Sequence, residues 1–370
     1  MKILHIYKDY YPVLGGIENH LKALAEAQVS LGHEVTVLVC DPGKRTHQET
    51  INGVTVIKAG RLLTAASMPL SLAQPLKLVR LRPDIVHLHS PYPLGELANW
   101  LAGRARGTVV TYHSDIVRAS QQKWLLLYRP FLKRILRAAD RIITTTPQYI
   151  ETSGWLRPIG DKCVVVPIGI DLHRFSPKQK PAARQAQKDF KLLFVGRLRY
   201  YKGLDTLLNA LPQIPEAQLT IVGVGPMEGA WRALTQALGL TDRVTFAGEI
   251  DDDHLPAYYQ QADLFVLPAN ARAEAYGIVL IEAMASGLPC VTTELGTGTS
   301  WVVQDGVTGF VVPPMDPPAL AKAINTLKTD AALRQQFGQA ALKRAQAKFS
   351  QEVMVDNVMQ VYNEVLKKTF

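Results

Sequence analysis

The fold prediction starts from residues 2–40, KILHIYKDYYPVLGGIENHLKALAEAQVSLGHEVTVLVC. A short apolar strand, KILHIY, is followed by a glycine turn at Gly15 and Gly16. An amphipathic helix comes next, with Leu21 and Leu24 on one face, and EVTVLVC is a second apolar strand. Two continuous apolar strands joined through a helix are typical of a parallel sheet that is buried on both faces.

The same alternation of strands and helices continues along the chain. Strand-like stretches in the first half are DIVHLHS, TVVTYHS, RIITTT and KCVVVP, and those in the second half are KLLFVGR, LTIVGVG, RVTFAGEI, DLFVLPA and PCVTT. Three helices are predicted at the end, over 316–328, 331–347 and 351–369. The pattern stops at 169–190, which is rich in Pro, Lys and Gln. We therefore predict an α/β protein of two Rossmann-like, doubly wound domains over 1–168 and 191–350, with 169–190 as the connection.

Bulk composition agrees with two globular domains. The chain has 370 residues, of which 47% are apolar and 20% are charged. Its three cysteines, Cys40, Cys163 and Cys290, are far apart in apolar surroundings, so we expect reduced core residues and no disulfide framework. We find no apolar run long enough to span a bilayer, and the opening apolar stretch is too short for a secretory signal. We therefore expect a cytoplasmic protein.

The net charge of +9 favours phosphate-bearing partners. Much of the excess lies in residues 104–141, where only Asp115 and Asp140 oppose nine basic residues. A helix at 121–141 has two interpretations, which the sequence leaves open. It can lie on an anionic membrane, or it can pack on the sheet with its basic edge in solvent. The residues concerned are Trp124, Leu127, Tyr128 and Phe131 on the apolar face and Lys133, Arg134 and Arg137 beside it.

Ligands of open α/β sheets bind beyond the carboxyl ends of the strands, so the loops there are the places to look for chemistry. Arg197 ends a strand, Lys202 lies in the loop, and a helix is expected to start near Gly203. Two cations beside a helix N-terminus suit a pyrophosphate, although solvated surface cations would have the same pattern. Gly15 and Gly16 allow a phosphate to approach backbone amides, or they form an ordinary tight turn.

Histidines also end strands in the first half. His113 ends TVVTYH, and a histidine there either faces the ligand cleft or is a structural residue. His87 and His89 alternate with apolar residues in VHLHS, so one is expected to face the cleft and the other to be packed.

Two further patterns are weak. Gly223, Gly225 and Gly229 have the spacing G-x-G-x-x-x-G, one residue longer than the dinucleotide fingerprint, which favours a turn lining a nucleotide pocket over a nicotinamide site. The acids at 251–253 precede a predicted helix. Capping of that helix explains them better than a metal site does, and we predict no metal ligands.

The segment EAYGIVLIEAMASG, residues 274–287, carries two acids eight positions apart. If a helix begins near Gly277, Glu274 lies in the loop before it and Glu282 lies a turn or more inside. Eight residues of helix span about 12 Å. That separation suits two sugar hydroxyl pairs better than the single scissile bond of a glycosidase. The spacing therefore predicts a cradle for a nucleotide sugar, with the pyrophosphate between a hexose and a ribose.

The sequence resembles the retaining glycosyltransferases of family 4, which have the GT-B fold. The resemblance rests on GGIENHLKALAEAQVSLGHEVTVLV, VGRLRYYKGLDTLL, EAYGIVLIEAMASGLPCV and DGVTGFVVPPMDPPALAKAI, and it covers nearly the whole chain. TELGTGTSWVVQDGVTG is similar to bacterial members that build cell-envelope polysaccharides. The resemblance implies two domains facing across a cleft, the first binding the acceptor and the second the donor. It also implies that residues 351–370 cross back to the first domain.

The resemblance assigns a role to each candidate residue. Arg197 and Lys202 would stabilise the departing diphosphate, Glu274 would contact the transferred sugar, and Glu282 would hold the ribose. Tyr276 stands where the family commonly has Phe, and the serine usual before the first glutamate is absent from PANARAEAYG. Gly277 and Ile278 would be backbone donors, and His113 would lie near the reacting end of the sugar. Gly16, with Gly15 beside it, is the remaining candidate.

The predicted reaction is metal-independent transfer of a hexose, with retention, from GDP-mannose or a UDP-hexose to a saccharide or lipid-linked saccharide. The nucleotide sugar is a substrate, and no cofactor is expected. An anionic membrane surface at the inner face of the cell membrane is a candidate partner, and nucleic acid is not expected. The alternatives are a nucleotide-sugar epimerase or glycan phosphorylase on the same frame, and a non-enzymatic binder of nucleic acid or anionic surfaces.

Overall fold

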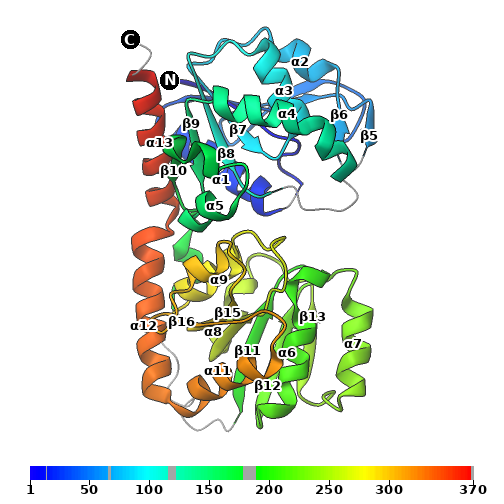
Figure 1. Cartoon of the computed structure of the whole chain (residues 1–370), viewed down its shortest axis with the longest axis vertical. Coiled ribbons are helices and arrows are strands. Elements are labelled where there is room, and N and C mark those ends of the chain that lie inside the picture. Colours follow the sequence, from blue (N-terminus) through cyan, green and yellow to red (C-terminus); the bar gives the residue numbers. More distant parts are fainter. Residues whose placement is uncertain (14, 66–67, 116–121, 178–188, 368–370) are drawn as a thin grey trace. The chain divides into compact units, whose positions relative to one another are not determined.

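The computed structural model describes residues 1–13, 15–65, 68–115, 122–177 and 189–367, with the backbone alone for 65, 68 and 122–127. These residues form two compact units (Figure 1). Unit 1 comprises 1–169 and 351–370, and unit 2 comprises 170–350. Residues 178–188 of the predicted connection lie outside the described residues.

Unit 1 is built on one sheet that has eight strands within the described residues. All neighbouring strands are parallel except the last two in the order, which are antiparallel. The order is β10 (Cys163–Val165), β9 (Arg141–Thr144), β8 (Gly107–Tyr112), β7 (Ile85–Ser90), β1 (Lys2–Ile6), β2 (Glu34–Cys40), β4 (Val54–Ala59), β3 (His47–Ile51).

The β3–β4 hairpin departs from the predicted strand–helix alternation. Asn52 and Gly53 connect its strands with φ angles of 48° and 82°. Positive φ at both positions is the geometry of the tight hairpin turn that Asn-Gly favours, so the local sequence did contain the signal. A second antiparallel pair, β5 (Leu63–Ala65) and β6 (Met68–Leu70), was also not predicted.

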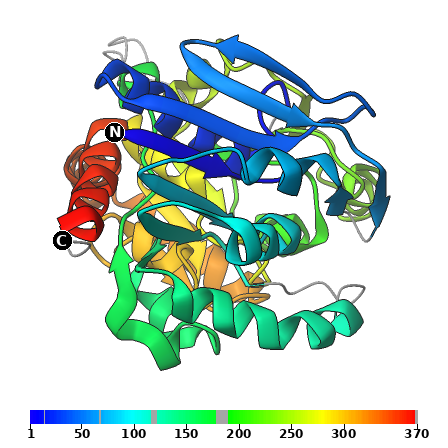
Figure 2. The ribbon, with the colours of Figure 1, turned by 90° about the horizontal axis from the view of Figure 1, so that it is seen from above.

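Helices cover the sheet of unit 1. Helices α1 (Gly16–Ser30) and α13 (Gln351–Lys367) pack against one another, and α1 buries Leu21 and Leu24 completely, as its amphipathic pattern predicts. Helix α3 packs against both α2 and α4. In Figure 2, α4 is the long blue-green helix along the lower edge. The bounds are α2 (Ala73–Leu78), α3 (Pro93–Ala102), α4 (Gln122–Ala138), α5 (Pro147–Thr152) and the 3-10 helix η2 (Arg157–Lys162).

Unit 2 has a fully parallel sheet of six strands within the described residues. The chain runs outward from β11 through β12 to β13, and then returns to place β14 on the other side of β11. A ligand crevice forms where the strand order reverses in this way. The order is β13 (Val244–Gly248), β12 (Ala217–Val222), β11 (Phe190–Val195), β14 (Leu264–Leu267), β15 (Cys290–Thr293), β16 (Gly309–Val312).

Most helices of unit 2 follow one of these strands in the chain, and α11 and α12 come after the last strand, β16 (Figure 1). Helix α6 packs against α7 and α11, and α9 packs against α12. The three C-terminal helices of the chain form as predicted, within two residues at each end. The bounds are α6 (Leu204–Ala210), α7 (Glu228–Ala237), α8 (Leu255–Gln261), α9 (Ile278–Ala285), α10 (Thr299–Val302), α11 (Pro317–Thr329), α12 (Ala331–Lys348) and the 3-10 helices η3 (Leu172–Phe175), η5 (Tyr200–Lys202) and η6 (Leu211–Gln213).

Two sequence predictions have clear outcomes here. The three cysteines are free, as expected, with Cys163 half-buried and the other two buried. The prediction that the acids at 251–253 cap a helix through their side chains is wrong. The N-cap of α8 is His254, which makes no side-chain capping bond, and the backbone carbonyl of Asp251 instead accepts from the amides of His254 and Leu255.

Candidate functional site

The strand-order reversal of unit 2 brings two predicted loops together. Arg197 follows β11 and is exposed, with no side-chain partner among the described residues. Lys202 ends the short helix η5, and Gly203, with φ of 66°, leads into α6 as predicted. The amide of Asn270, in the loop after β14, donates to the carbonyl of Tyr201 over 3.0 Å. The loops after β11 and β14 are therefore held side by side at the carboxyl edge of the sheet.

An ion pair between Lys202 and Glu274 connects the two loops. Lys202 Nζ lies 2.6 Å from Glu274 Oε2, and both side chains are nearly buried, at 11% and 10% exposure. Burial alone lowers the pKa of Lys202, but the ion pair and hydrogen bond with Glu274 outweigh it and raise that pKa. The ammonium group is therefore held charged at this edge of the sheet.

The second glutamate lies inside α9, as the sequence predicts. Tyr259 of α8 donates its hydroxyl to Glu282 Oε2 over 2.5 Å. Burial raises the pKa of Glu282, and Asp252 adds to the rise, while the Tyr259 hydroxyl and the cations Arg174 and Lys202 oppose it. Glu282 thus has one oxygen oriented by Tyr259, and two cations and one acid act on its charge.

Helix α9 starts between the two acids. Gly277 is its N-cap, with φ of 82°, and a Cβ there would lie 2.8 Å from Leu280 Cδ1, so a glycine is needed on both counts. Ile278 is the first helical residue, and no side chain caps this end. Tyr276, just before the turn, is 4% exposed. Among the described residues no side chain caps the N–H groups at the start of α9, so they suit an anion, and the role of Gly277 and Ile278 as backbone donors stays a prediction.

Unit 1 carries the other predicted residues. Gly16 is the first residue of α1 and Gly15 is its N-cap, with an extended backbone and no side-chain capping bond. A Cβ on Gly15 would lie 2.2 Å from the carboxylate of Glu18, which in turn pairs with Lys8 at 3.7 Å. The turn leaves the first amides of a 15-residue helix uncapped.

His113 directly follows β8 and belongs to a buried cluster of histidines. His5 Nδ1 lies 3.1 Å from His89 Nε2, and His89 Nδ1 lies 3.1 Å from His113 Nε2. His87 bonds elsewhere, to the hydroxyls of Thr111 and Tyr362. His20, on α1, is the remaining member, with its ring centroid 5.3 Å from that of His113. The expectation that either His87 or His89 faces the cleft is wrong, because both are completely buried.

Burial keeps this cluster neutral. It lowers the pKa of His5 and of His20 to about 4, and it lowers the pKa of His113 well below the usual range, with His20 adding to that effect. The ring nitrogens of His20, and Nδ1 of His113, have no hydrogen-bond partner among the described residues. Candidate metal-ligating nitrogens of His20, His89 and His113 lie within 4.8 Å of one another, as do those of His5, His87 and His89. Hydrogen bonds from His5 to His89, and from His87 to Thr111 and Tyr362, account for the second set, whereas both nitrogens of His20 in the first set have no such partner among the described residues.

Sequence reasoning missed several residues of both sites. Tyr259 could not be found because its partner Glu282 is 23 positions away in a different helix. His5 and His20 were not singled out, although one sits in the first strand and the other in the first helix. The one available signal was that four histidines occur in β1, in β7 and at the end of β8. These strands are neighbours in the sheet.

The fold and unit 2 site define a class of protein. Two Rossmann-like units, with two cations, two acids and a helix start at a strand-order reversal, are the parts needed to bind a nucleoside diphosphate joined to a sugar. The glycosyl transferases group 1 family model matches residues 175–344, and the glycosyltransferase family 4 model matches residues 14–174. The chain belongs to this glycosyltransferase family, and it is a glycosyltransferase with the predicted GT-B fold.

Similar proteins agree with this assignment. The chain is 34% identical to O-antigen chain mannosyltransferase C of Escherichia coli, over 99% of each chain. It is 36% identical to D-rhamnosyltransferase WbpZ of Pseudomonas aeruginosa, over 95% of this chain and 92% of the relative. Among solved structures, sucrose-phosphate synthase of Thermosynechococcus elongatus has a TM-score of 0.77 at 26% identity, with 99% of each chain covered. The prediction of a transferase is confirmed over the epimerase, phosphorylase and non-enzymatic alternatives.

Proposed function

We propose that this glycosyltransferase moves a hexose of manno configuration from a nucleoside diphosphate onto a saccharide or lipid-linked saccharide of a cell-envelope polysaccharide, at the cytoplasmic side. Two relatives named for mannose and D-rhamnose support the sugar, because D-rhamnose is 6-deoxymannose and the two share the axial 2-hydroxyl. The donor that we favour is GDP-mannose, with UDP-hexoses as competitors. The second unit would bind the donor and the first unit the acceptor.

The ion pair of Lys202 and Glu274 carries the proposal. A nearly buried ammonium group 2.6 Å from a carboxylate, next to the free amides at the start of α9, is arranged for a ligand that has both a diphosphate and sugar hydroxyls. Lys202 would bind the diphosphate while Glu274 accepts hydrogen bonds from the hexose, and Glu282 would accept from the ribose. No cofactor is then required.

The reaction would depend on electrostatic help to the leaving group. As the sugar–phosphate bond breaks, negative charge grows on the diphosphate, and Lys202 and Arg197 would offset it. Since these two cations provide positive charge, we propose that no metal ion is needed. We also propose retention at the anomeric carbon, with a diphosphate oxygen accepting the proton of the attacking hydroxyl. His113 would lie near the reacting end of the sugar.

Variants of the ion pair test the proposal. Removing Lys202 alone would leave a buried carboxylate without its partner and destabilise the unit, so we pair Lys202→Met with the double variant Lys202→Met/Glu274→Gln, which removes both charges. We expect both to lose at least about 100-fold in kcat, while the double variant keeps a melting temperature near that of the wild type. Lys322→Ala, at an exposed position of α11, is the matched control and should stay fully active.

The readout is acceptor-dependent release of nucleoside diphosphate from GDP-mannose and from UDP-glucose. Near-normal kcat in a folded Lys202→Met variant would remove the diphosphate assignment. Anomeric proton NMR of the product tests retention, and an inverted product would contradict it. Activity that disappears with a chelator and returns with Mg²⁺ would contradict metal independence.

We further propose peripheral binding to an anionic membrane through α4. No helix in the described part of the chain is long and apolar enough to cross a bilayer. Phe131 is 37% exposed on α4, and Arg134 is exposed three positions further on. Tyr128, by contrast, donates its hydroxyl to Glu96 of α3 and is packed inward; the side chains of Trp124 and Leu127 lie outside the described residues. Cosedimentation with anionic vesicles at low salt, lost in Phe131→Ser/Arg134→Gln, is the expected result.

A further inference from the structure

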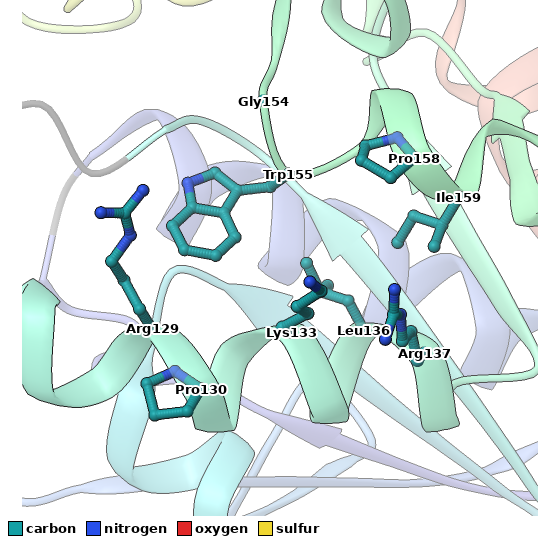
Figure 3. Close-up of a pocket in the computed structure, with 9 residues that line it drawn as sticks. All are labelled: Arg129, Pro130, Lys133, Leu136, Arg137, Gly154, Trp155, Pro158 and Ile159. Carbon is teal, nitrogen blue, oxygen red and sulfur yellow. The ribbon is translucent and has the colours of Figure 1, made fainter.

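Unit 1 contains a pocket that none of the predicted site residues lines. It has a volume of about 440 Å³ and lies between α4 and the segment 154–159 (Figure 3). That volume falls within the range of small-molecule sites. Leu136, which is buried, contributes to its lining from α4, and Pro158 lies across from that helix.

Three cations line this pocket without any acid among the lining residues. Arg129, Lys133 and Arg137 follow one another at intervals of four along α4, and Figure 3 shows them on the side of the helix that faces Trp155. All three are exposed, and none has an ion-pair partner among the described residues. Like charges at this helical spacing repel one another weakly, and a bound anion would offset that repulsion.

Trp155 supplies the opposite wall. The Arg129 guanidinium carbon lies 5.5 Å from the centroid of its indole ring, and the ring is half-buried. Figure 3 shows the indole across from α4, with the guanidinium of Arg129 beside it. An indole combines a broad apolar face with low conformational freedom and can stack on the apolar face of a sugar ring. The pocket thus combines an indole wall, over which Arg129 lies, with three cations along the facing helix.

We propose that this pocket binds a sugar ring that carries a phosphate or diphosphate, as the phosphorylated end of the acceptor. The assignment as acceptor site rests on the proposed function, but binding itself does not. Guanidinium and ammonium groups are strong donors to phosphate oxygens. A membrane surface is a poorer match, because a flat array of headgroups would need neither a recess nor an aromatic wall. The acceptor would be anchored here by its phosphate, independently of Arg197 and Lys202.

The test measures binding of mannose 1-phosphate by calorimetry, with the donor site kept filled by the nucleoside diphosphate that binds most tightly. We expect Lys133→Gln/Arg137→Gln to weaken binding at least tenfold, since it removes two charge-assisted hydrogen bonds. Arg134→Gln, on the same helix but outside the pocket lining, is the matched control and should bind as the wild type does. Uncharged methyl mannoside should bind at least tenfold more weakly than mannose 1-phosphate.

Two results would overturn the proposal. One is equal affinity of the wild type and Lys133→Gln/Arg137→Gln for mannose 1-phosphate. The other is that mannose 1-phosphate does not bind at all, whereas anionic vesicles bind in a way that depends on Lys133 and Arg137. That result would identify a membrane-contacting patch. Failure of the proposed function can be distinguished from failure of this proposal. If the proposed function is wrong, the wild type shows no acceptor-dependent nucleotide release, but the pocket still binds mannose 1-phosphate. If both proposals hold, the double variant raises KM for a phosphorylated acceptor and leaves kcat and the donor KM unchanged.

Discussion

The buried histidine cluster should make unit 1 sensitive to acid. The pKa of His5 and of His20 is about 4 in the folded chain, whereas an unfolded histidine has a pKa of about 6.5. Between those values the unfolded chain binds more protons, so stability falls as the pH falls. At pH 5 each of the two histidines lowers the free energy of unfolding by about 2 kcal/mol relative to pH 7. The loss should be complete only near pH 3, below both values.

Hydrogen exchange measured by mass spectrometry resolves this effect by unit. After correction for the intrinsic pH dependence of exchange, protection of β1 and β7 should fall between pH 6.5 and pH 5, and that of β11 and β14 in unit 2 should fall less. His20→Leu removes one titrating group whose nitrogens have no partner among the described residues. We expect it to reduce the slope of unit 1 stability with pH by up to about 1.4 kcal/mol per pH unit. Equal acid sensitivity of the two units in the wild type would refute the reasoning.

Three further predictions concern unit 2. Tyr259→Phe removes the hydrogen bond to Glu282 and should raise the donor KM about tenfold with little change in kcat; a change confined to kcat in steady-state assays would contradict the ribose assignment. Gly203→Ala, at φ of 66° with a Cβ that would lie 2.0 Å from the carbonyl oxygen of Pro268, should cost at least about 2 kcal/mol and lower the melting temperature by about 5 °C. Asp330→Ala removes the N-cap of α12 and should cost about 1 kcal/mol in thermal melts, with unchanged activity.

The parallel strands and long helices could be predicted because their signals are local. Apolar runs of four to seven residues mark strands such as β2, β11 and β14, and α13 repeats its apolar residues with helical spacing. The β3–β4 hairpin was missed for a different reason. Only Val54, Val56, Ile57 and Ala59 of β4 are buried, and β3 is mostly exposed, so the pair lacks the apolar run of the other strands. The Asn52–Gly53 dipeptide was the only strong local sign.

The candidate donor site was predictable for a topological reason. Residues that follow parallel strands meet at one edge of the sheet, so Arg197 and Lys202 after β11, and Glu274 after β14, were expected in one place before their contacts were known. What the sequence could not give is the pairing itself. The Lys202–Glu274 ion pair joins residues 72 positions apart, and neither periodicity nor motif spacing states which carboxylate meets which ammonium group.

That ion pair also limits how the donor can bind. Without ligand, Lys202 and Glu274 neutralise each other inside a nearly buried site, so the crevice holds no uncompensated buried charge there. Arg197 is exposed and free of side-chain partners among the described residues, so it can meet an arriving diphosphate first. If Lys202 then turns toward the phosphate, Glu274 loses its partner unless sugar hydroxyls replace it. A nucleoside diphosphate without its sugar cannot provide those hydroxyls, so the intact nucleotide sugar should bind more tightly than the diphosphate in the wild type, and this preference should shrink in Glu274→Gln. Calorimetric titration of both ligands measures that difference, and an equal preference in the two proteins would separate Glu274 from the sugar.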